Sequence, residues 1–398
     1  MFGIICTFFL NGIMARTFDK PILVTRPYLP PLEDFRRGLE EVWTNQWLSN
    51  NGPLVKRFQH ELAVYLGVAD TNLSLFANGT LALELGFQAL GLSGAEVVTT
   101  PFTFVATSHA LKRIGATPVF ADIDSDTFCL SPEAAEQKIT SRTKAIVPVH
   151  VYGHACDVEG FARLSEKYGV KVIYDAAHAF GVFGHGPDET RGKSFGDRAS
   201  IGCYGDMSMF SFHPTKLFHS CEGGLLVFKD AALQERLGQL RNFAIKGELS
   251  CVDVGTNAKM NELQALMGLE CLKAMDSLLA ARAEIHAAYR EAFAGCDKVL
   301  FPNPSDFMRG FTPNYAYCPV LFRDCDTRER VYEGLKAENV FSRRYFYPLL
   351  TDFAPYAYGR GTCPVAEDVS RRVLTLPTYY GLPLDDVKAI AQNVMEIL

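Results

Sequence analysis

A lysine in the middle of the chain has surroundings that suit covalent chemistry. Lys216 lies between Phe212 and Phe218, in a turn that joins two apolar runs. An apolar environment disfavours the ammonium form of a lysine, and the neutral amine is a nucleophile. Such an amine forms a Schiff base with an aldehyde cofactor or a ketone substrate. The alternative is a surface turn with Lys216 in solvent, because lysine side chains are seldom buried.

A carboxylate and an imidazole follow another apolar run. Asp175 comes directly after residues 172–174 and precedes small residues, which let a flat ring approach closely. At a strand end, an Asp caps the next helix or pairs with a protonated ring nitrogen. A pyridine ring held in this way is an electron sink, which is the property that pyridoxal phosphate chemistry requires. His178 suits a hydrogen bond to the phenolic oxygen of that ring, with a core or capping role as the alternative.

A turn near the start of the chain is suited to an anion. Gly79 and Thr80 open an apolar helix over residues 81–90, directly after a short apolar strand. The first N–H groups of a helix and the positive end of its dipole attract negative charge. The alternative is an N-cap at Asn78 or Thr80 without a ligand. The chain thus offers the groups that a pyridoxal phosphate site needs. They are an anion-binding turn at Gly79 and Thr80, an aromatic ring within residues 101–104, an acid at Asp175, a hydroxyl at Ser211 and an amine at Lys216.

Strand and helix patterns alternate along most of the chain. Strands are expected over residues 73–76, 96–99, 117–123, 145–152, 170–174, 208–212, 225–228 and 315–322. Helices are expected over residues 32–47, 55–66, 81–90, 104–114, 158–168, 263–293, 327–337 and 385–397. Apolar strands separated by helices indicate a largely parallel sheet that is covered on both faces. Ligands of such sheets bind at the carboxyl ends of the strands, which is where Asp175, Lys216 and the turn at Gly79 fall.

Composition narrows the class of protein. The chain has 398 residues, 48% of them hydrophobic, and a formal net charge of −6. This length predicts two domains, and the acidic balance without a Lys/Arg cluster argues against nucleic-acid binding. Eleven scattered cysteines with no C-x-x-C pair indicate reduced thiols in a cytoplasmic protein, and neither a metal site nor a disulfide framework.

The first residues are apolar without forming a recognisable targeting signal. They lack the basic start and the cleavage site of a signal peptide, and the run is too short to span a bilayer. Because Met14 opens an ordinary polar sequence, we expect residues 1–13 to be an upstream start, with an interfacial anchor as the alternative. No other membrane segment is expected.

Seven motifs, in order, resemble the DegT/DnrJ/EryC1/StrS sugar aminotransferases. They are Asn-Gly-Thr at 78–80, Thr-Phe-Val-Ala-Thr at 103–107, Pro-Val-His-Val-Tyr-Gly at 148–153, Tyr-Asp-Ala-Ala-His at 174–178, Ser-Phe-His-Pro-Thr-Lys at 211–216, Glu-Gly-Gly at 222–224 and Asn-Ala-Lys-Met-Asn-Glu at 257–262. The resemblance runs from about Tyr28 to the C-terminus. It implies an α/β protein of fold type I, aspartate-aminotransferase-like, with a mostly parallel central sheet and a smaller α+β C-terminal domain. The implied boundaries are an N-terminal extension over 1–27, a large cofactor-binding domain over 28–262 and a small domain over 263–398.

The resemblance also implies a cofactor, pyridoxal 5′-phosphate (PLP), and residues that hold its ring. Lys216 looks like the Schiff-base lysine, and Asp175 looks like the partner of the pyridine nitrogen. Phe104 is similar to the aromatic residue stacked on the ring, and His178 is similar to the residue beside the phenolic oxygen. Sugar dehydratases of this family carry His in place of the lysine, so Lys216 favours transamination.

Phosphate and subunit contacts are implied in the same way. Gly79, Thr80 and Ser211 look like phosphate ligands, and Asn257 resembles the residue that reaches the phosphate from the neighbouring subunit. A homodimer with shared active sites follows from that resemblance.

The substrate implied is a nucleotide sugar, with L-glutamate as the amino donor. Residues 24–31, 47–53 and 75–80 resemble the transaminases that make dTDP-4-amino-4,6-dideoxyglucose from dTDP-4-keto-6-deoxy-D-glucose. A C-3 keto-sugar aminotransferase, a UDP-sugar 4-aminotransferase and, remotely, a cofactor-binding regulator remain alternatives. The residues expected to line the substrate site are Asn51, Arg344, Tyr345 and Tyr347.

Overall fold

The computed structural model describes residues 16–185, 198–303 and 310–398. The predicted upstream start at residues 1–13 lies outside these ranges. In the part of the chain that is described, no helix is long and apolar enough to cross a membrane. All ten cysteines within the described ranges are free thiols.

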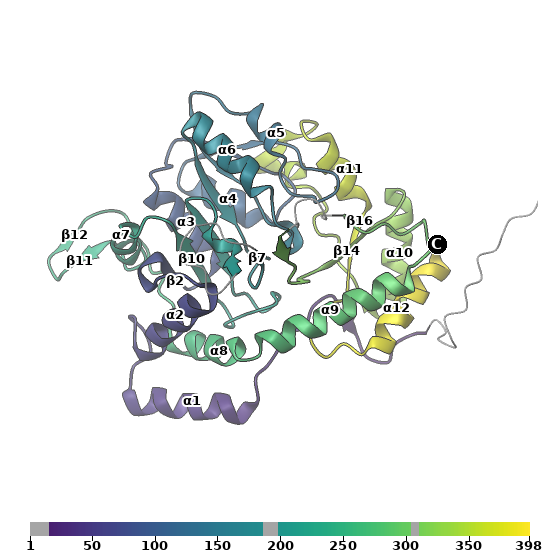
Figure 1. The fold of residues 1–398 in the computed structure, drawn as a ribbon, viewed down its shortest axis with the longest axis horizontal. Coiled ribbons are helices and arrows are strands. Elements are labelled where there is room, and N and C mark those ends of the chain that lie inside the picture. Colours follow the sequence, from purple (N-terminus) through teal and green to yellow (C-terminus); the bar gives the residue numbers. More distant parts are fainter. Residues whose placement is uncertain (1–15, 186–197, 304–309) are drawn as a thin grey trace, which may run out of the picture.

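A seven-stranded sheet forms the centre of the larger part of the molecule (Figure 1). The strand order is β2-β10-β9-β6-β5-β3-β4, and the four pairings from β9 to β4 are parallel. β10 runs antiparallel to both of its neighbours, so the sheet is mostly parallel with one reversed strand. Its strands are β2 (Leu73–Phe76), β3 (Glu96–Thr99), β4 (Thr117–Phe120), β5 (Thr143–Val147), β6 (Lys171–Asp175), β9 (Met207–Ser211) and β10 (Gly224–Phe228).

Helices and buried apolar side chains surround this sheet. Almost every residue of its strands is buried, which explains the unbroken apolar runs in the sequence. The helices of this part are α1 (Leu32–Asn45), α2 (Pro53–Leu66), α3 (Gly79–Ala89), α4 (Val105–Arg113), α5 (Pro132–Glu136), α6 (Val158–Tyr168), α7 (Leu233–Leu240) and α8 (Glu262–Leu272). Apart from two elements described below, the helices and strands expected here are confirmed, with ends that differ by a few residues.

A second, smaller core is built around a two-stranded sheet. Its antiparallel strands are β14 (Cys318–Leu321) and β16 (Val373–Leu376), and α9 (Met275–Ala292), α10 (Cys325–Ala337), α11 (Pro364–Arg372) and α12 (Leu384–Ile397) belong to the same part of the chain. The N-terminal segment joins this core, because β1 (Ile22–Leu23) pairs in parallel with β15 (Val340–Phe341), and Phe18 is buried there.

Three short strands and one hairpin complete the fold. β7 (Phe183–His185) lies between β8 (Arg198–Ser200) and β13 (Phe311–Thr312) in a small antiparallel sheet. β11 (Ile245–Lys246) and β12 (Ser250–Cys251) form a hairpin that stands away from the main body (Figure 1).

Two expectations about element length were wrong. The helix expected over 263–293 is divided into α8 and α9, with a tight turn in which the Ala274 N–H bonds the Cys271 carbonyl at 3.1 Å. The division separates a helix of the large core from one that packs in the small core. The strand expected over 145–152 ends at Val147, because the chain then turns through Tyr152, whose φ is 59°.

Candidate active site

The sheet brings the predicted residues to a single edge. β2, β6 and β9 point in the same direction and end there, while β10 starts there. The chain therefore places Asn78, Asp175 and Ser211 at neighbouring strand ends, with Gly224 opposite Ser211 in the register. This is the carboxyl edge at which ligands of such sheets bind.

The turn at the start of α3 contains a helix cap and also leaves backbone N–H groups that could bind an anion. The Asn78 side chain accepts the N–H of Leu81 at 2.9 Å, so the predicted N-cap is present. The N–H groups of Gly79 and Thr80 belong to the first turn, where a helix supplies no acceptor of its own. The cap and the anion site therefore use different donors, and the two interpretations of this turn are compatible.

Two glycines keep this cradle open. A Cβ added to Gly224 would lie 2.5 Å from the Asn78 carbonyl oxygen and 2.8 Å from the Gly79 Cα. A Cβ on Gly79 would lie 3.1 Å from the Cβ of Ser211. The backbone of β10 and the start of α3 therefore approach each other as closely as glycine allows, and the half-buried Ser211 hydroxyl lies beside them. Two backbone donors, a hydroxyl and a helix N-terminus are a donor set for a phosphate group.

Asp175 is buried and held by two hydrogen bonds. Its side chain is 4% exposed, accepts from the Thr107 hydroxyl at 2.7 Å and accepts from the Ala177 N–H at 3.1 Å. Burial raises the pKa of this carboxyl, while the bonds to Thr107 and Ala177 and the charge of Lys216 act in the opposite direction. A buried carboxylate in this state gains most from a cationic N–H partner, which is what a protonated pyridine nitrogen offers.

His178 is neutral, with a defined tautomer. Burial, assisted by the charge of Lys216, holds its pKa well below the usual value. Its Nδ1 accepts the Tyr152 N–H at 3.1 Å, so the proton of the neutral ring lies on Nε2. His178 thus presents an N–H donor, as required of a partner for a phenolic oxygen.

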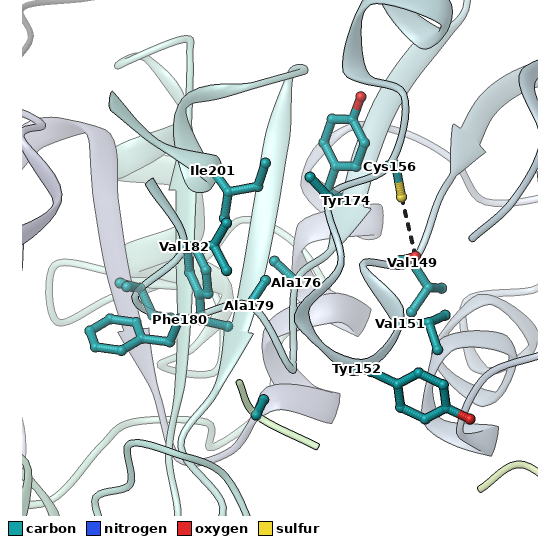
Figure 2. Packing of buried hydrophobic residues seen from close by; sticks show 14 of the residues in the cluster. Val149, Val151, Tyr152, Cys156, Tyr174, Ala176, Ala179, Phe180, Val182 and Ile201 are labelled. Carbon is teal, nitrogen blue, oxygen red and sulfur yellow. Dashed lines mark hydrogen bonds between the residues drawn. The ribbon is translucent and has the colours of Figure 1, made fainter. Parts of the chain in front are cut away.

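Residues on both sides of His178 have apolar side chains that pack in the core (Figure 2). Ala176, Ala179 and Phe180 lie on one side of the chain in that view, and Tyr152 lies across from them. The Cys156 thiol bonds the Val149 carbonyl at 3.2 Å and so closes the neighbouring turn. The imidazole itself packs against the rings of Tyr317 and Phe346, with centroids 4.8 and 6.1 Å away.

Lys216 is half-buried, between the buried and the solvent-exposed alternatives that its sequence leaves open. The rings of Phe212 and Phe218 pack against each other in the core, with centroids 4.8 Å apart, and leave Lys216 at the edge. Its Nζ donates to the hydroxyl of Tyr317 at 3.3 Å. The amine is thus accessible at the same edge as Asp175 and His178.

Phe104 is the exposed aromatic residue of this site. It is the residue before α4, and 58% of its surface is exposed. Its carbonyl oxygen accepts from the Thr107 hydroxyl at 3.3 Å, the same hydroxyl that bonds Asp175. An exposed ring next to a buried carboxylate is suited to stacking on a flat ligand.

Two other predicted residues lie on exposed segments of the chain. Asn257 is exposed and pairs with Asn242 in an isolated bridge. Asn51 is exposed in the turn before α2, where its φ is 59°. Both belong to surface segments of the single chain.

Of the residues expected to meet substrate, Tyr345 lies nearest to Lys216. Its ring meets Tyr317 edge-on at 5.8 Å, and its carbonyl accepts the hydroxyl of Tyr152. The guanidinium of Arg344 pairs with Glu329 on α10 instead of facing the site. The ring of Tyr347 lies under the Arg328 guanidinium at 4.3 Å.

Several site residues were not identified from the sequence. Thr107 is the last residue of the motif at 103–107. Its position four residues after Thr103 on a helical turn was the feature from which its role could have been predicted. Tyr317 and Asn314 lie in the segment between β13 and β14, and no local pattern marks them. Asn314 donates to the His178 and Phe180 carbonyls at 2.7 and 2.9 Å, which joins this segment to the loop after β6.

The residues present fit PLP. The cradle at Gly79, Thr80 and Ser211 would hold its phosphate, Asp175 its ring nitrogen, His178 its phenolic oxygen and Lys216 its aldehyde carbon. Each of these groups is of the required type, and all of them lie at one edge of the sheet.

Comparison with known proteins gives a consistent result. Residues 32–395 match the DegT/DnrJ/EryC1/StrS aminotransferase family. A dTDP-4-amino-4,6-dideoxy-D-glucose transaminase of Shigella dysenteriae is 40% identical over 95% of this chain and 100% of its own length. A UDP-N-acetyl-3-dehydro-alpha-D-glucosamine 3-aminotransferase of Acidithiobacillus ferrooxidans is 34% identical over 97% of this chain and 100% of its own.

Solved structures share the fold. DesI, solved in the presence of its TDP-sugar product, superposes with a TM-score of 0.84 and 37% identity, covering 95% of this chain and 93% of its own. NtdA of Bacillus subtilis, solved with bound cofactor PMP, has a TM-score of 0.80 and 25% identity, covering 92% of this chain and 81% of its own.

Proposed function

The chain belongs to the DegT/DnrJ/EryC1/StrS aminotransferase family and is a PLP-dependent nucleotide-sugar aminotransferase, and we propose that it forms dTDP-4-amino-4,6-dideoxy-D-glucose. The amino group would come from L-glutamate and would be placed on C-4 of dTDP-4-keto-6-deoxy-D-glucose. The observation that carries this proposal is 40% identity, over 95% of the chain, to a transaminase named for that product. The 37% identity to DesI, solved with a TDP-sugar, supports the same nucleotide.

The site residues support transamination in the following way. PLP supplies an electron sink that eases loss of the proton from the carbon next to an amino group. The Asp175 carboxylate would hold the proton on the ring nitrogen, and the neutral His178 would donate its Nε2–H to the phenolic oxygen. The N–H groups at the start of α3 would bind the phosphate and orient the ring.

Lys216 would move the proton. Its Nζ, once released by the donor amine, would act as a general base at the donor's α-carbon and then as a general acid. The half-exposed position of this amine permits both contact with substrate and return of the proton. In the second half of the reaction the same atom would act in reverse on the sugar carbon.

A second copy of the chain would complete the site. The hairpin β11–β12 and its flanks expose Ile245, Leu249, Val252 and Val254, of which Leu249 is 98% exposed. A two-stranded hairpin with exposed apolar side chains is marginal in water and favours a partner surface. Asn257 follows this hairpin, so we propose that it contributes to the neighbouring site in a homodimer.

The test of the activity is a substrate panel. The protein is incubated with PLP, 15N-labelled L-glutamate and one keto sugar at a time. The three sugars are a dTDP-4-keto, a UDP-4-keto and a 3-keto nucleotide sugar. NMR of the product locates the nitrogen. Amination of the dTDP sugar at C-4 with the highest kcat/KM supports the proposal, and preference for either other substrate contradicts it.

The test of the shared site uses mixed dimers. Lys216→Ala and Asn257→Ala proteins are each expected to be inactive. Co-expressed subunits form mixed dimers with one intact site, so roughly a quarter of the wild-type activity should return. Absence of any recovery, with dimers present by light scattering, would contradict sharing through Asn257.

A further inference from the structure

The amine of Lys216 has a partner in the segment directly before β14. Its Nζ lies 3.3 Å from the hydroxyl of Tyr317, which is 101 residues farther along the chain. Tyr317 is 5% exposed, so its hydroxyl has little access to bulk water. The lysine of the large domain therefore meets a buried hydroxyl that directly precedes β14.

The ring of Tyr317 is fixed by aromatic neighbours. Its centroid lies 4.8 Å from that of His178, 6.0 Å from that of Tyr152 and 5.8 Å from that of Tyr345. Packing on these sides leaves the ring little rotational freedom, and the hydroxyl has a defined place beside Lys216.

The backbone on which Tyr317 stands is tied down in the same way. The Asn314 side chain donates to the His178 carbonyl at 2.7 Å and accepts from the Ala316 N–H at 3.1 Å. The buried Arg282 of α9 donates to the Ala316 carbonyl at 2.7 Å. Tyr317 is thus attached both to the loop that carries His178 and to the helix that leads into the small domain.

We propose that Tyr317 is a positioning residue for Lys216. A hydroxyl accepts a hydrogen bond from the ammonium form of a lysine and donates one to its neutral amine. Tyr317 therefore holds Nζ in one place in both protonation states, next to Asp175 and His178. This inference rests on the role proposed above for Lys216.

The step that depends on this placement is condensation with an aldehyde. The neutral amine forms a C=N bond to the aldehyde carbon, and the two amine protons leave with the carbonyl oxygen as water. The amine must reach the carbon at a defined angle, so loss of positioning by about 1 Å reduces the rate by up to about 100-fold.

The experiment measures covalent attachment directly. Protein freed of cofactor is mixed with PLP, samples are reduced with borohydride at intervals, and mass spectrometry quantifies the modified Lys216 peptide from pH 6 to pH 9. In Tyr317→Phe we expect attachment at pH 7.5 to slow about 10- to 100-fold and its pH profile to move. In turnover assays kcat falls, while KM for the sugar nucleotide changes less than about 3-fold.

A matched variant controls for stability. Tyr289→Phe also removes the hydroxyl of a fully buried tyrosine, one that donates to the Pro377 carbonyl at 3.1 Å in the small core. It should lower the melting temperature about as much as Tyr317→Phe and leave attachment unchanged. Equal attachment rates and pH profiles in Tyr317→Phe and wild type, or equal losses in both variants, overturn the inference.

Failure of the underlying role is recognisable separately. If Lys216→Ala still forms a reducible bond with PLP at another lysine and retains turnover, the role of Lys216 itself is wrong. If Lys216 is required but Tyr317→Phe behaves like wild type, only the positioning role is refuted.

Discussion

Replacement of Gly224 by alanine tests whether close approach of β10 to α3 creates the phosphate cradle. The new Cβ would lie 2.5 Å from the Asn78 carbonyl oxygen and 2.6 Å from its carbon. Both are backbone atoms, so no side chain can rotate away. The carbonyl must recede by about 0.5 Å before the contact reaches 3.0 Å, and the first turn of α3 must move with it.

The expected magnitude follows from the donors that move. The Gly79 and Thr80 N–H groups are the proposed donors to the phosphate, and each such charge-assisted bond contributes about 1.5 kcal/mol. Loss of one to two of them weakens phosphate binding by about 1.5–3 kcal/mol, or roughly 10- to 100-fold. Overpacking itself lowers the free energy of unfolding by about 1–3 kcal/mol.

The assay separates the phosphate from the rest of the cofactor. Absorbance titrations with PLP and with pyridoxal, which lacks the phosphate, give two dissociation constants, and the constant for pyridoxal divided by that for PLP measures the contribution of the cradle. We expect this ratio to fall about 10- to 100-fold in Gly224→Ala and less in Gly79→Ala, where the nearest side-chain atoms are 3.1 Å away.

Gly238 in α7 supplies the matched control. A Cβ there meets nothing within 4 Å, so Gly238→Ala should raise the free energy of unfolding by about 0.5–1 kcal/mol and leave the ratio unchanged. A pyridoxal-to-PLP ratio in Gly224→Ala equal to that of wild type would refute the assignment of the cradle.

Three further predictions concern buried ionisable groups. Asp175→Asn should lower turnover by about 100-fold or more, and a variant with normal turnover would contradict this. The same change should raise the melting temperature of the cofactor-free protein at pH 7. Burial raises the pKa of this carboxyl, so it ionises first in the unfolded chain as the pH rises, and its charge then favours unfolding. Glu262→Ala should lower the free energy of unfolding, measured in urea, by about 3 kcal/mol. The side chain is 1% exposed and accepts two N–H groups at the start of α2, at 2.8 and 3.0 Å. Glu262→Gln should lower it by less, because the amide oxygen still accepts. Acidification from pH 6.5 to pH 5 should lower the free energy of unfolding by about 1.6 kcal/mol in total for each of His150 and His286, because burial lowers each pKa to about 3 whereas the unfolded histidines, half-protonated at pH 6.5, take up the rest of their protons. An unchanged pH slope in His286→Gln would contradict the last prediction.

Residues whose roles depend on local geometry could be recognised in the sequence. Asn78 was expected as a possible cap before an apolar helix, and in the structure it caps α3. Asp175 was expected directly after a strand, and it is the last residue of β6. The hydrophobic period, the capping residues and the length of a strand are each properties of a short segment. The sequence of that segment is therefore enough to predict them.

Pairings between distant segments could not be read in this way. The Lys216–Tyr317 and Asn314–His178 contacts join residues more than 100 positions apart, and no spacing rule connects them. Arg344 was expected to line the substrate site, but it pairs with Glu329 on α10, a helix whose orientation relative to this segment only packing decides. The reversed direction of β10 likewise follows from sheet assembly, since an apolar strand reads alike in either direction.

What the sequence by itself determined is therefore the set of chemical groups and the strand or helix end that carries each of them. The tertiary structure alone decided the state of those groups: a buried Asp175 held by Thr107, a neutral His178 with its proton on Nε2, and a Lys216 amine that meets Tyr317. The physical reason is that burial and hydrogen bonding depend on which segments meet. These contacts shift the balance between charged and neutral forms, and they do not exist until the fold assembles them.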